Sequence, residues 1–501
     1  MFRQPGVPVT DMHQASSIEA APPIAVVPTD NLGWSLFKNS AVQIAGRLFI
    51  ALSRLVVAGL IIRGYGNDMF GQYSLVFGML AIADWLVDFG TTEIFVRDIS
   101  REPARGRRLL GVLTAAKMAQ VPASFAVLAA ILLMLRYPAT VVEAGLAGGM
   151  SLIFYGGVIV YRVMFRVALT MERDVTAELL SVMAMIPLVA LVCTYGGGLV
   201  ALAACHVVSR SAYLGACFVF GRRQYRPSIR GVAWRDVRES LRSSMAVGVI
   251  GFLVGGYETL DILLLSKLGS FSQLAYYSGA QRLVWPVLMA LAAVAATFYP
   301  VIATYWPHSH TQFESACQRS LDVVFLLAGF VLCSMLAGPT FFMGVLGPEL
   351  VSGAPVLMVL AILCLVKAIT SSVGPVFYVV GAQTRALQFI ALAVVLKVAV
   401  MAALAPRYGY MGVAYSALAV EACVATAAVV LIRRIAGLRV RWSAILKVTV
   451  IMAVGAVVPR VLFPSGGFPA AVAAPALYAV LACLSGAVRP SELRTLLRWG
   501  R

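Results

Sequence analysis

Two arginines seven residues apart, Arg47 and Arg54, lie within a strongly apolar stretch near the start of the sequence. In an α-helix seven residues make almost two turns, so both guanidinium groups lie on one face, about 10 Å apart along the axis. A guanidinium group is a planar fork of donors that suits phosphate oxygens. Two such groups along one face would suit a pyrophosphate, provided that the face lines a wet cavity.

Further ionisable residues interrupt other apolar stretches of the chain. A charged side chain at the centre of a bilayer costs roughly 2.5–3.5 kcal/mol on insertion scales, so it normally faces a cavity or an opposite charge. We expect four of them to bind a substrate together with the two arginines: Arg282, Asp261, Lys367 and Lys397. We expect three others to act in gating or ion pairing: Asp84, Asp88 and Glu258.

The alternative is that these charges only neutralise one another. Asp84 and Asp88 are four residues apart and share a helix face, so either could pair with Arg47 or Arg54. Lysines in apolar helices can also extend their ammonium groups to the membrane surface. The sequence leaves both interpretations open.

Metal and covalent chemistry find no support in the sequence. The eight cysteines form no CxxC pair and the four histidines are scattered, so neither a metal site nor a disulfide framework is indicated. No nucleophile–base constellation is recognisable, and we predict no cofactor and no enzymatic activity. The net charge of +18 is not interleaved with exposed aromatic residues, so we expect no nucleic-acid partner.

The composition is that of a membrane protein. Of the 501 residues, 60% are hydrophobic and 12% are charged, whereas a soluble protein has about 25% charged residues. A stretch of about 20 apolar residues spans a ~30 Å hydrocarbon layer. We predict an all-α integral membrane protein with 14 helices, near residues 41–62, 70–91, 109–135, 141–165, 174–194, 198–220, 243–266, 274–300, 319–346, 353–381, 384–405, 409–432, 443–463 and 467–488.

Arginine is unevenly divided between alternate loops. One set of loops includes the arginine-rich segments 97–108 and 222–242, whereas the other set has mostly single charges such as Arg63, Arg136 and Arg407. The positive-inside rule places the arginine-rich set in the cytoplasm. We therefore predict a multi-pass protein of the bacterial cytoplasmic membrane with both termini cytoplasmic and with external loops of about ten residues or fewer.

An internal repeat divides the chain into two similar parts. A glycine precedes a tyrosine by seven residues in both 66–73 and 269–276, and Tyr-Gly stands before a helix in both 195–198 and 408–412. Each repeat holds six predicted helices, an even number, so the two copies have the same orientation. Parallel repeats of this kind form two lobes with the substrate between them.

The repeat and the loops together predict the domain boundaries. The predicted parts are a flexible tail over 1–31, an N-lobe of helices 1–6 over 32–221, a basic linker over 222–242, a C-lobe of helices 7–12 over 243–435, helices 13–14 over 436–489 and a basic C-terminus over 490–501.

Several of these stretches resemble one known family. The sequences Leu60–Tyr73, Asp88-Phe-Gly90 and Val96–Arg101 are similar to the opening of the Wzx-type polysaccharide flippases of the multidrug/oligosaccharidyl-lipid/polysaccharide (MOP) exporter superfamily, and 261–283 resembles their helix-seven to helix-eight region. The resemblance extends over about residues 32–435. It implies a V-shaped pair of six-helix lobes, alternating access, and a central cationic cavity lined by the two arginines of helix one and, on the other lobe, by Asp261 and Arg282.

The resemblance also implies the cargo, an undecaprenyl-diphosphate-linked oligosaccharide. We therefore expect a flippase that moves this lipid-linked glycan for lipopolysaccharide or exopolysaccharide synthesis, in contact with membrane lipids and with other polysaccharide-assembly proteins of the membrane. A cation-coupled multidrug antiporter of the same superfamily is an alternative that would need an acidic cavity. A membrane glycan polymerase or ligase is another, for which the predicted external loops are short.

Overall fold

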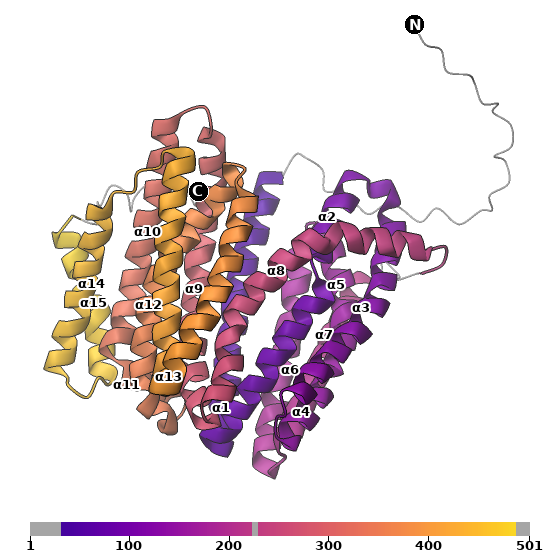
Figure 1. Cartoon of the computed structure of the whole chain (residues 1–501), viewed down its shortest axis with the longest axis horizontal. Coiled ribbons are helices and arrows are strands. Elements are labelled where there is room, and N and C mark those ends of the chain that lie inside the picture. The colour runs from indigo at the N-terminus through magenta and orange to yellow at the C-terminus, as the bar shows by residue number, and fades with distance from the viewer. Residues whose placement is uncertain (1–31, 223–228, 487–501) are drawn as a thin grey trace, which may run out of the picture.

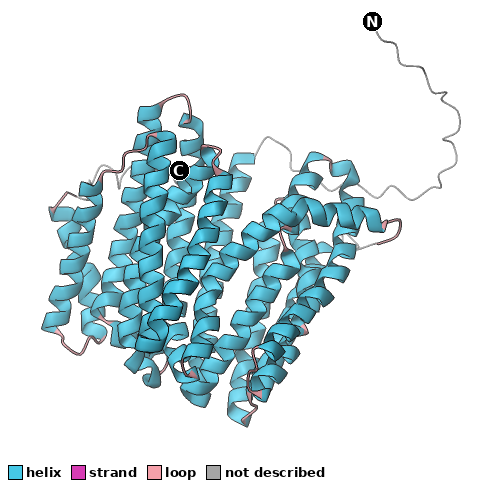
Figure 2. Ribbon diagram, viewed as in Figure 1, coloured by secondary structure: helices cyan, strands magenta, loops and turns pink. Residues whose placement is uncertain are grey.

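The computed structural model describes residues 32–222 and 229–486. Within these residues the chain is a set of packed helices with no strand (Figure 1, Figure 2). The predicted tail over 1–31 and the basic C-terminus over 490–501 lie outside the described residues, as does a part of the predicted linker. The prediction of an all-α architecture is confirmed.

Seven of the described helices precede the gap at 223–228. They are α1 (Leu32–Asp88), α2 (Thr91–Arg101), α3 (Gly106–Met134), α4 (Ala139–Gly149), α5 (Ser151–Val167), α6 (Met171–Tyr195) and α7 (Leu199–Gly221), with the 3₁₀ helix η2 (Pro103–Arg105) before α3. Those after the gap are α8 (Trp234–Leu268), α9 (Phe271–Tyr305), α10 (His310–Ala337), α11 (Pro339–Leu346), α12 (Ala354–Val379), α13 (Gln383–Ala436), α14 (Trp442–Leu462) and α15 (Phe468–Leu484), with η3 (Pro348–Gly353) before α12.

Eleven helical segments of the described chain are long and apolar enough to cross a membrane. Two of the helices, α1 with 57 residues and α13 with 54, each contain a non-helical glycine. At about 1.5 Å per residue each would exceed 80 Å if straight, more than twice a ~30 Å hydrocarbon layer, so each has the length of two crossings. The number 14 stays a prediction, because it requires both kinked helices to cross twice and the 17-residue α15 to cross as well.

The bend in α1 depends on one glycine and is fastened to the other half of the chain. Gly66 has φ 79° and ψ −174°, a backbone region that essentially only glycine occupies. The next residue, Asn67, donates a hydrogen bond from its backbone N–H to Glu349 Oε2 and another from its side-chain amide to the Glu349 carbonyl, both at 3.1 Å. The bend therefore lies against η3, and the two halves of α1 meet at the bottom of Figure 1.

The second pair of similar segments in the predicted repeat, 195–198 and 408–412, also coincides with backbone bends. Gly196, at the end of α6, has φ 72°, and Gly409, within α13, has φ 57°. Both glycines therefore have positive φ between two consecutive long helical stretches, although Gly196 ends α6 and Gly409 lies inside α13. This agreement supports the repeat, and the division into two six-helix lobes stays a prediction.

Several predicted boundaries differ from the structure. The helix predicted over 141–165 is two helices, α4 and α5, on either side of Met150, and the start of the predicted loop 97–108 belongs to α2. The helix predicted over 319–346 is two helices, α10 and α11, because Pro339 has no N–H to continue the α10 ladder. The predicted linker 222–242 is partly helical, since α8 begins at Trp234. Asp236 lies in the first turn of α8, where a negative charge favours helix, and it forms an ion pair with Arg108 at 3.0 Å. The sequence predicts a loop at this site.

The packing places α8 and α9 where the two halves of the chain meet. The helix α1 packs against α6 and α9, while α8 contacts both α1 and α13, and α12 packs between α9 and α13. The pair α14–α15 packs on α10 at the end of the molecule farthest from α2–α7 (Figure 1). The arginine-rich segment of α2 lies at the top of this view and α4 and α11 at the bottom, so the charge-rich and charge-poor connections occupy opposite ends of the bundle.

Replacement of Gly66 by alanine should destabilise the protein. The added Cβ would be strained at φ 79° and would lie 3.0 Å from the Glu349 carboxylate, so we expect a loss of about 1–3 kcal/mol. The measurement is the melting temperature of the purified protein in detergent. The matched control is Gly215→Ala, since Gly215 is helical in α7 with open space around its missing Cβ; an equal fall in both variants would contradict the assignment of strain to Gly66.

Candidate functional site

Three ion pairs within α1–α7 gather charged side chains from four helices. Arg54 of α1 contacts Glu178 of α6 at 3.1 Å, and Asp84 in the second half of α1 contacts Arg210 of α7 at 2.5 Å. The third pair joins Arg162 of α5 to Asp174 of α6 at 3.3 Å. We call these six residues the N-terminal charge cluster. Ionised side chains inside an apolar helix bundle need such partners, because an unpaired charge there is costly.

Aromatic side chains complete this cluster. The guanidinium group of Arg210 lies 4.2 Å from the ring centre of Tyr155, and Arg162 donates a hydrogen bond to the Tyr213 hydroxyl at 3.1 Å. Tyr213 in turn donates to Asp174 at 2.7 Å. Two of the three arginines are thus held on several sides, which leaves them little freedom to bind anything else.

Arg54 is the accessible arginine of the N-terminal charge cluster. Its side chain is 61% exposed, against 25% for its partner Glu178. Arg47 is exposed too, and it forms no ion pair with any residue that the structure describes. The predicted pairing of either arginine with Asp84 or Asp88 is therefore not the one adopted, since Asp84 takes Arg210 and Arg54 takes Glu178.

Arg282 reaches from the second half of the chain to α1. Its guanidinium group lies 5.0 Å from the ring centre of Phe70 and 5.3 Å from that of Tyr73. No carboxylate lies within ion-pair distance of Arg282 in the described parts of the chain. Stacking on aromatic rings holds a cation in place without neutralising its charge, so Arg282 keeps the capacity to bind an anion.

Asp88 lies at the junction of α1 and α2. Its Oδ1 accepts hydrogen bonds from the backbone N–H of Thr92 at 3.1 Å and from the Thr92 hydroxyl at 2.6 Å. The buried ammonium group of Lys117 binds four oxygens at the same junction, among them the Val87 carbonyl at 2.6 Å and the Thr91 hydroxyl at 2.5 Å. These contacts fix the start of α2; a gating role of Asp88 stays a prediction.

A second group of charges, which we call the C-terminal charge cluster, is formed by Glu258, Asp261, Lys367, Lys397 and Glu421. Asp261 of α8 contacts Lys397 of α13 at 2.9 Å, and the two side chains are only 6% and 3% exposed. Glu258 of α8 contacts Lys367 of α12 at 2.5 Å. Four predicted residues thus lie together in one place, three from the expected substrate-binding set and Glu258 from the expected gating or ion-pairing set.

Tyrosine hydroxyls satisfy the remaining oxygens of the C-terminal charge cluster. Tyr277 donates to Asp261 at 2.7 Å, and Tyr257 donates to Glu421 at 3.0 Å. Lys397 also donates to the Tyr257 carbonyl at 2.6 Å. The cluster surrounds a cavity of about 30 Å³, room for about two water molecules.

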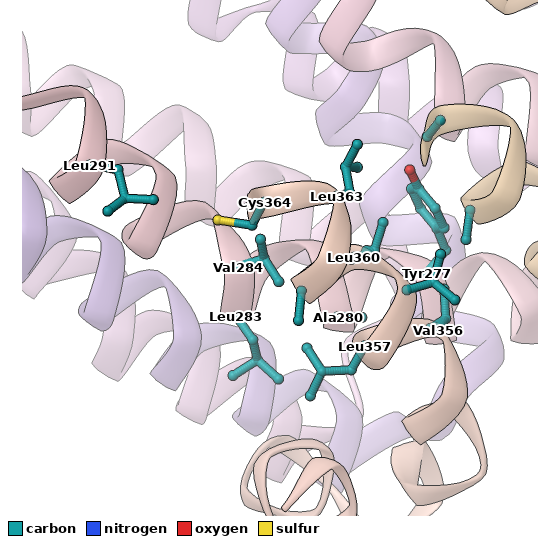
Figure 3. Packing of buried hydrophobic residues seen from close by; sticks show 14 of the residues in the cluster. Tyr277, Ala280, Leu283, Val284, Leu291, Val356, Leu357, Leu360, Leu363 and Cys364 are labelled. Carbon is teal, nitrogen blue, oxygen red and sulfur yellow. The ribbon is translucent and has the colours of Figure 1, made fainter. Parts of the chain in front are cut away.

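The apolar wall of this cavity is the contact between α9 and α12. Tyr277 and Val284 of α9 face Leu360 and Leu363 of α12 in Figure 3. These side chains are buried in one continuous core. In this conformation the C-terminal charge cluster is therefore compact, with two carboxylates paired to lysines and Glu421 bound by two hydroxyl groups, and it has no space for a large solute.

The structure thus separates the predicted substrate residues into two places. Arg47, Arg54 and Arg282 carry accessible or unneutralised charge, whereas Asp261, Lys367 and Lys397 are engaged in the C-terminal charge cluster. The sequence interpretation missed five members of the two clusters: Arg162, Asp174, Glu178, Arg210 and Glu421. The signal was present, since Arg210 and Glu421 interrupt apolar stretches in the same way as Lys367 does.

The eleven apolar segments long enough to cross a membrane in the described chain define a multi-pass membrane protein. Residues 36–306 match the family model described as "Polysaccharide biosynthesis protein", which covers more than half of the chain. The chain belongs to this family. The expected resemblance to the polysaccharide flippases of the MOP superfamily is confirmed.

Solved structures share the fold at low sequence identity. The lipid II flippase MurJ in an inward closed conformation matches with a TM-score of 0.75 and 9% identity, over 88% of this chain and 97% of that one. An inward-facing MATE family multidrug resistance transporter of the MOP superfamily matches with a TM-score of 0.62 and 18% identity, over 79% and 98%. A MOP superfamily transporter from Pyrococcus furiosus, described as having a reversed polarity of its binding pocket, matches with a TM-score of 0.58 and 17% identity, over 81% and 96%. No curated protein matches by sequence.

Breaking the buried pair between Asp261 and Lys397 should be far more harmful than breaking an exposed pair. Lys397→Met leaves a buried carboxylate without its counter-charge, so we expect a loss of about 3–5 kcal/mol, seen as a lower melting temperature. The double variant Asp261→Asn/Lys397→Met should recover most of this loss. The control is Glu102→Gln, which breaks the exposed pair with Arg105 and should cost less than about 1 kcal/mol. A double variant as unstable as the single one would argue against charge pairing as the cause.

Proposed function

We propose that this protein is a flippase that moves a polyprenyl-diphosphate-linked oligosaccharide across the bacterial cytoplasmic membrane by alternating access. The observation that carries the proposal is the pair Arg54 and Arg282. Arg54 is accessible, Arg282 has no carboxylate partner within the described residues, and the two belong to opposite halves of the chain. Guanidinium groups so placed favour a ligand with phosphate oxygens.

The two arginines lie at similar depth in the bundle. Arg54 is twelve residues before the Gly66 bend, and Arg282 is eleven residues after the start of α9 at Phe271. At 1.5 Å per residue these distances are about 18 Å and about 16 Å. Both starting points lie at the same end of the bundle, since the Cα of Gly71, shortly after the bend, approaches the Phe271 backbone. The proposal requires a single diphosphate between the two halves to meet both guanidinium groups.

The distribution of negative charge favours an anionic over a cationic cargo. A cation exporter needs free carboxylates in its cavity, whereas Glu258 and Asp261 are paired with lysines and Glu421 accepts hydrogen bonds from Tyr257 and Thr370. Membership of a polysaccharide biosynthesis family and the likeness to a lipid II flippase point to the same class of cargo. Both supports are coarser than the proposal, which names a diphosphate-linked glycan.

The orientation and the partners follow from the same proposal. The arginine-rich end of the bundle, where α2 and the start of α8 lie, would be cytoplasmic under the positive-inside rule. Both termini would then be cytoplasmic, and the halves before and after the 222–242 segment would be the two lobes that move. Membrane lipids surround the protein in this arrangement, and enzymes that build and polymerise the glycan act before and after it.

The decisive experiment separates a structural from a substrate-binding role of Arg54. We expect Arg54→Gln to lower transport at least tenfold, because it removes a charge-assisted contact with the diphosphate. The double variant Arg54→Gln/Glu178→Gln removes the ion pair without leaving an unpaired carboxylate, and it should remain inactive. Transport is measured in proteoliposomes as the exposure of a labelled polyprenyl-diphosphate oligosaccharide to an external reagent.

The controls set the scale of this experiment. Glu178→Gln alone should retain most of the activity, and so should Arg101→Gln, which removes an exposed arginine at the end of α2. Arg282→Gln should be as defective as Arg54→Gln. Recovery of transport in the Arg54→Gln/Glu178→Gln variant would show that Arg54 serves only to neutralise Glu178, and the proposal would lose its main support.

A further inference from the structure

A long groove lies on the outer side of α12 and α13, away from both charge clusters. It has a volume of about 580 Å³ and is closed at one end by the start of α14. The lining side chains of α12 and α13 are Val366, Ile369, Ala422, Ala425, Thr426, Val429, Val430 and Arg433. The segment between α13 and α14 adds Leu438, Arg439 and Val440, and α14 adds its first residue, Trp442.

The floor of the groove is one face of α13. Positions 422, 425, 426, 429, 430 and 433 follow the spacing of residues that share a helix face. All of these residues except Arg433 are small or β-branched, so their short side chains leave a depression between the neighbouring helices. Its one hydroxyl, that of Thr426, already donates to the Ala422 carbonyl at 2.8 Å. The floor therefore offers apolar contact and no free polar group.

The length of the groove matches one leaflet of a membrane. From Ala422 to Arg433 is eleven residues, or about 16 Å along the helix. Half of a ~30 Å hydrocarbon layer is about 15 Å. A chain of apolar carbon atoms that ran from the interface to the bilayer midplane would therefore fill the groove from end to end.

Both charged residues of the groove lie at the same end. The side chains of Arg433 and Arg439 are exposed and form no ion pair with any residue between 32 and 222 or between 229 and 486. The backbone beneath them is fixed, since the N–H groups of Arg439 and Arg441 donate to Glu314 and Gln318 at 2.8 Å. Trp442, 51% exposed at this end, is of the type that marks a membrane–water interface.

We propose that this groove binds an anionic phospholipid, with one acyl chain along α13 and the phosphate between Arg433 and Arg439. Basic pockets between membrane helices at the cytoplasmic interface are suited to anionic headgroups, and guanidinium groups bind phosphate with charge-assisted hydrogen bonds. The site is distinct from the proposed transport pathway: Val366 and Ala422 line the groove, while the adjacent Lys367 and Glu421 belong to the C-terminal charge cluster. An occupant would hold α12, α13 and the start of α14 together.

Native mass spectrometry of the purified full-length protein tests the site directly. The probes are phosphatidylglycerol and phosphatidylcholine with identical acyl chains, and a polyprenyl phosphate as a third arm. The variant Arg433→Gln/Arg439→Gln should bind phosphatidylglycerol at least tenfold more weakly than the unmodified protein. The matched control Arg434→Gln/Arg441→Gln removes the same charge from the same region, outside the groove, and should change binding less than twofold.

A second pair of variants tests the apolar part of the site. Thr426→Trp fills the groove and should also lower phosphatidylglycerol binding at least tenfold, whereas Cys423→Trp adds the same bulk at an exposed position outside the groove and should not. Melting temperatures show whether each variant is folded. If the arginine variant is not folded, the pair of tryptophan variants decides whether the groove binds the lipid. Equal loss in both arginine pairs, equal binding of phosphatidylcholine, or stronger binding of the polyprenyl phosphate would each overturn the proposal. None of these outcomes bears on Arg54, because no transport is measured.

Discussion

An ionised side chain in an apolar bundle must be met by an opposite charge, by hydrogen-bond donors or acceptors, or by water. The described structure obeys this constraint with two compact clusters, one in each half of the chain. In the N-terminal charge cluster Arg162 and Arg210 each face an aspartate and a tyrosine ring or hydroxyl. In the C-terminal charge cluster Asp261, Lys397 and Tyr277 form a chain of contacts that is almost entirely buried. These contacts hold the helices in register. The clusters therefore have a structural role in the fold, whatever their part in a mechanism.

Three places satisfy this constraint on buried charge only in part, and these are the candidates for function. Arg54 satisfies the constraint only in part, since Glu178 neutralises it while most of its side chain stays exposed. Arg282 satisfies it by stacking on Phe70 and Tyr73, which stabilises a cation without removing its attraction for an anion. The groove at Arg433 and Arg439 is a third exception, at the interface and not in the interior. Each of these places offers positive charge next to apolar surface, which is the chemical character of a phosphate-bearing lipid.

Much of the fold could be predicted from the sequence because length and hydropathy dominate in a membrane protein. The apolar stretches near 109–135, 174–194 and 198–220 became α3, α6 and α7 within a few residues. The prediction of helix boundaries was less accurate where a single glycine or proline determines the path of the backbone. Gly66 and Gly409 are bends within helices rather than loops between them, and Pro339 divides a stretch that has uniform hydropathy. Spacing along a helix gives the face of a residue but not the helix opposite to it, which is why the sequence offered Arg47 or Arg54 as possible partners of Asp84 and did not identify Arg210. The partner of a buried charge depends on tertiary packing, which one sequence with no relatives beside it does not contain.

Arg54 and Arg282, the two arginines proposed to bind one diphosphate, have a thermodynamic consequence for an empty protein. Two like charges from opposite halves of the chain repel, so any arrangement that brings them nearer is disfavoured while nothing lies between them. An anion that binds both reverses the sign of this contribution, and a ligand shifts a conformational equilibrium only through such a difference in affinity between states. Under the proposed function, this repulsion would oppose closure around water alone, and a bound diphosphate would favour closure.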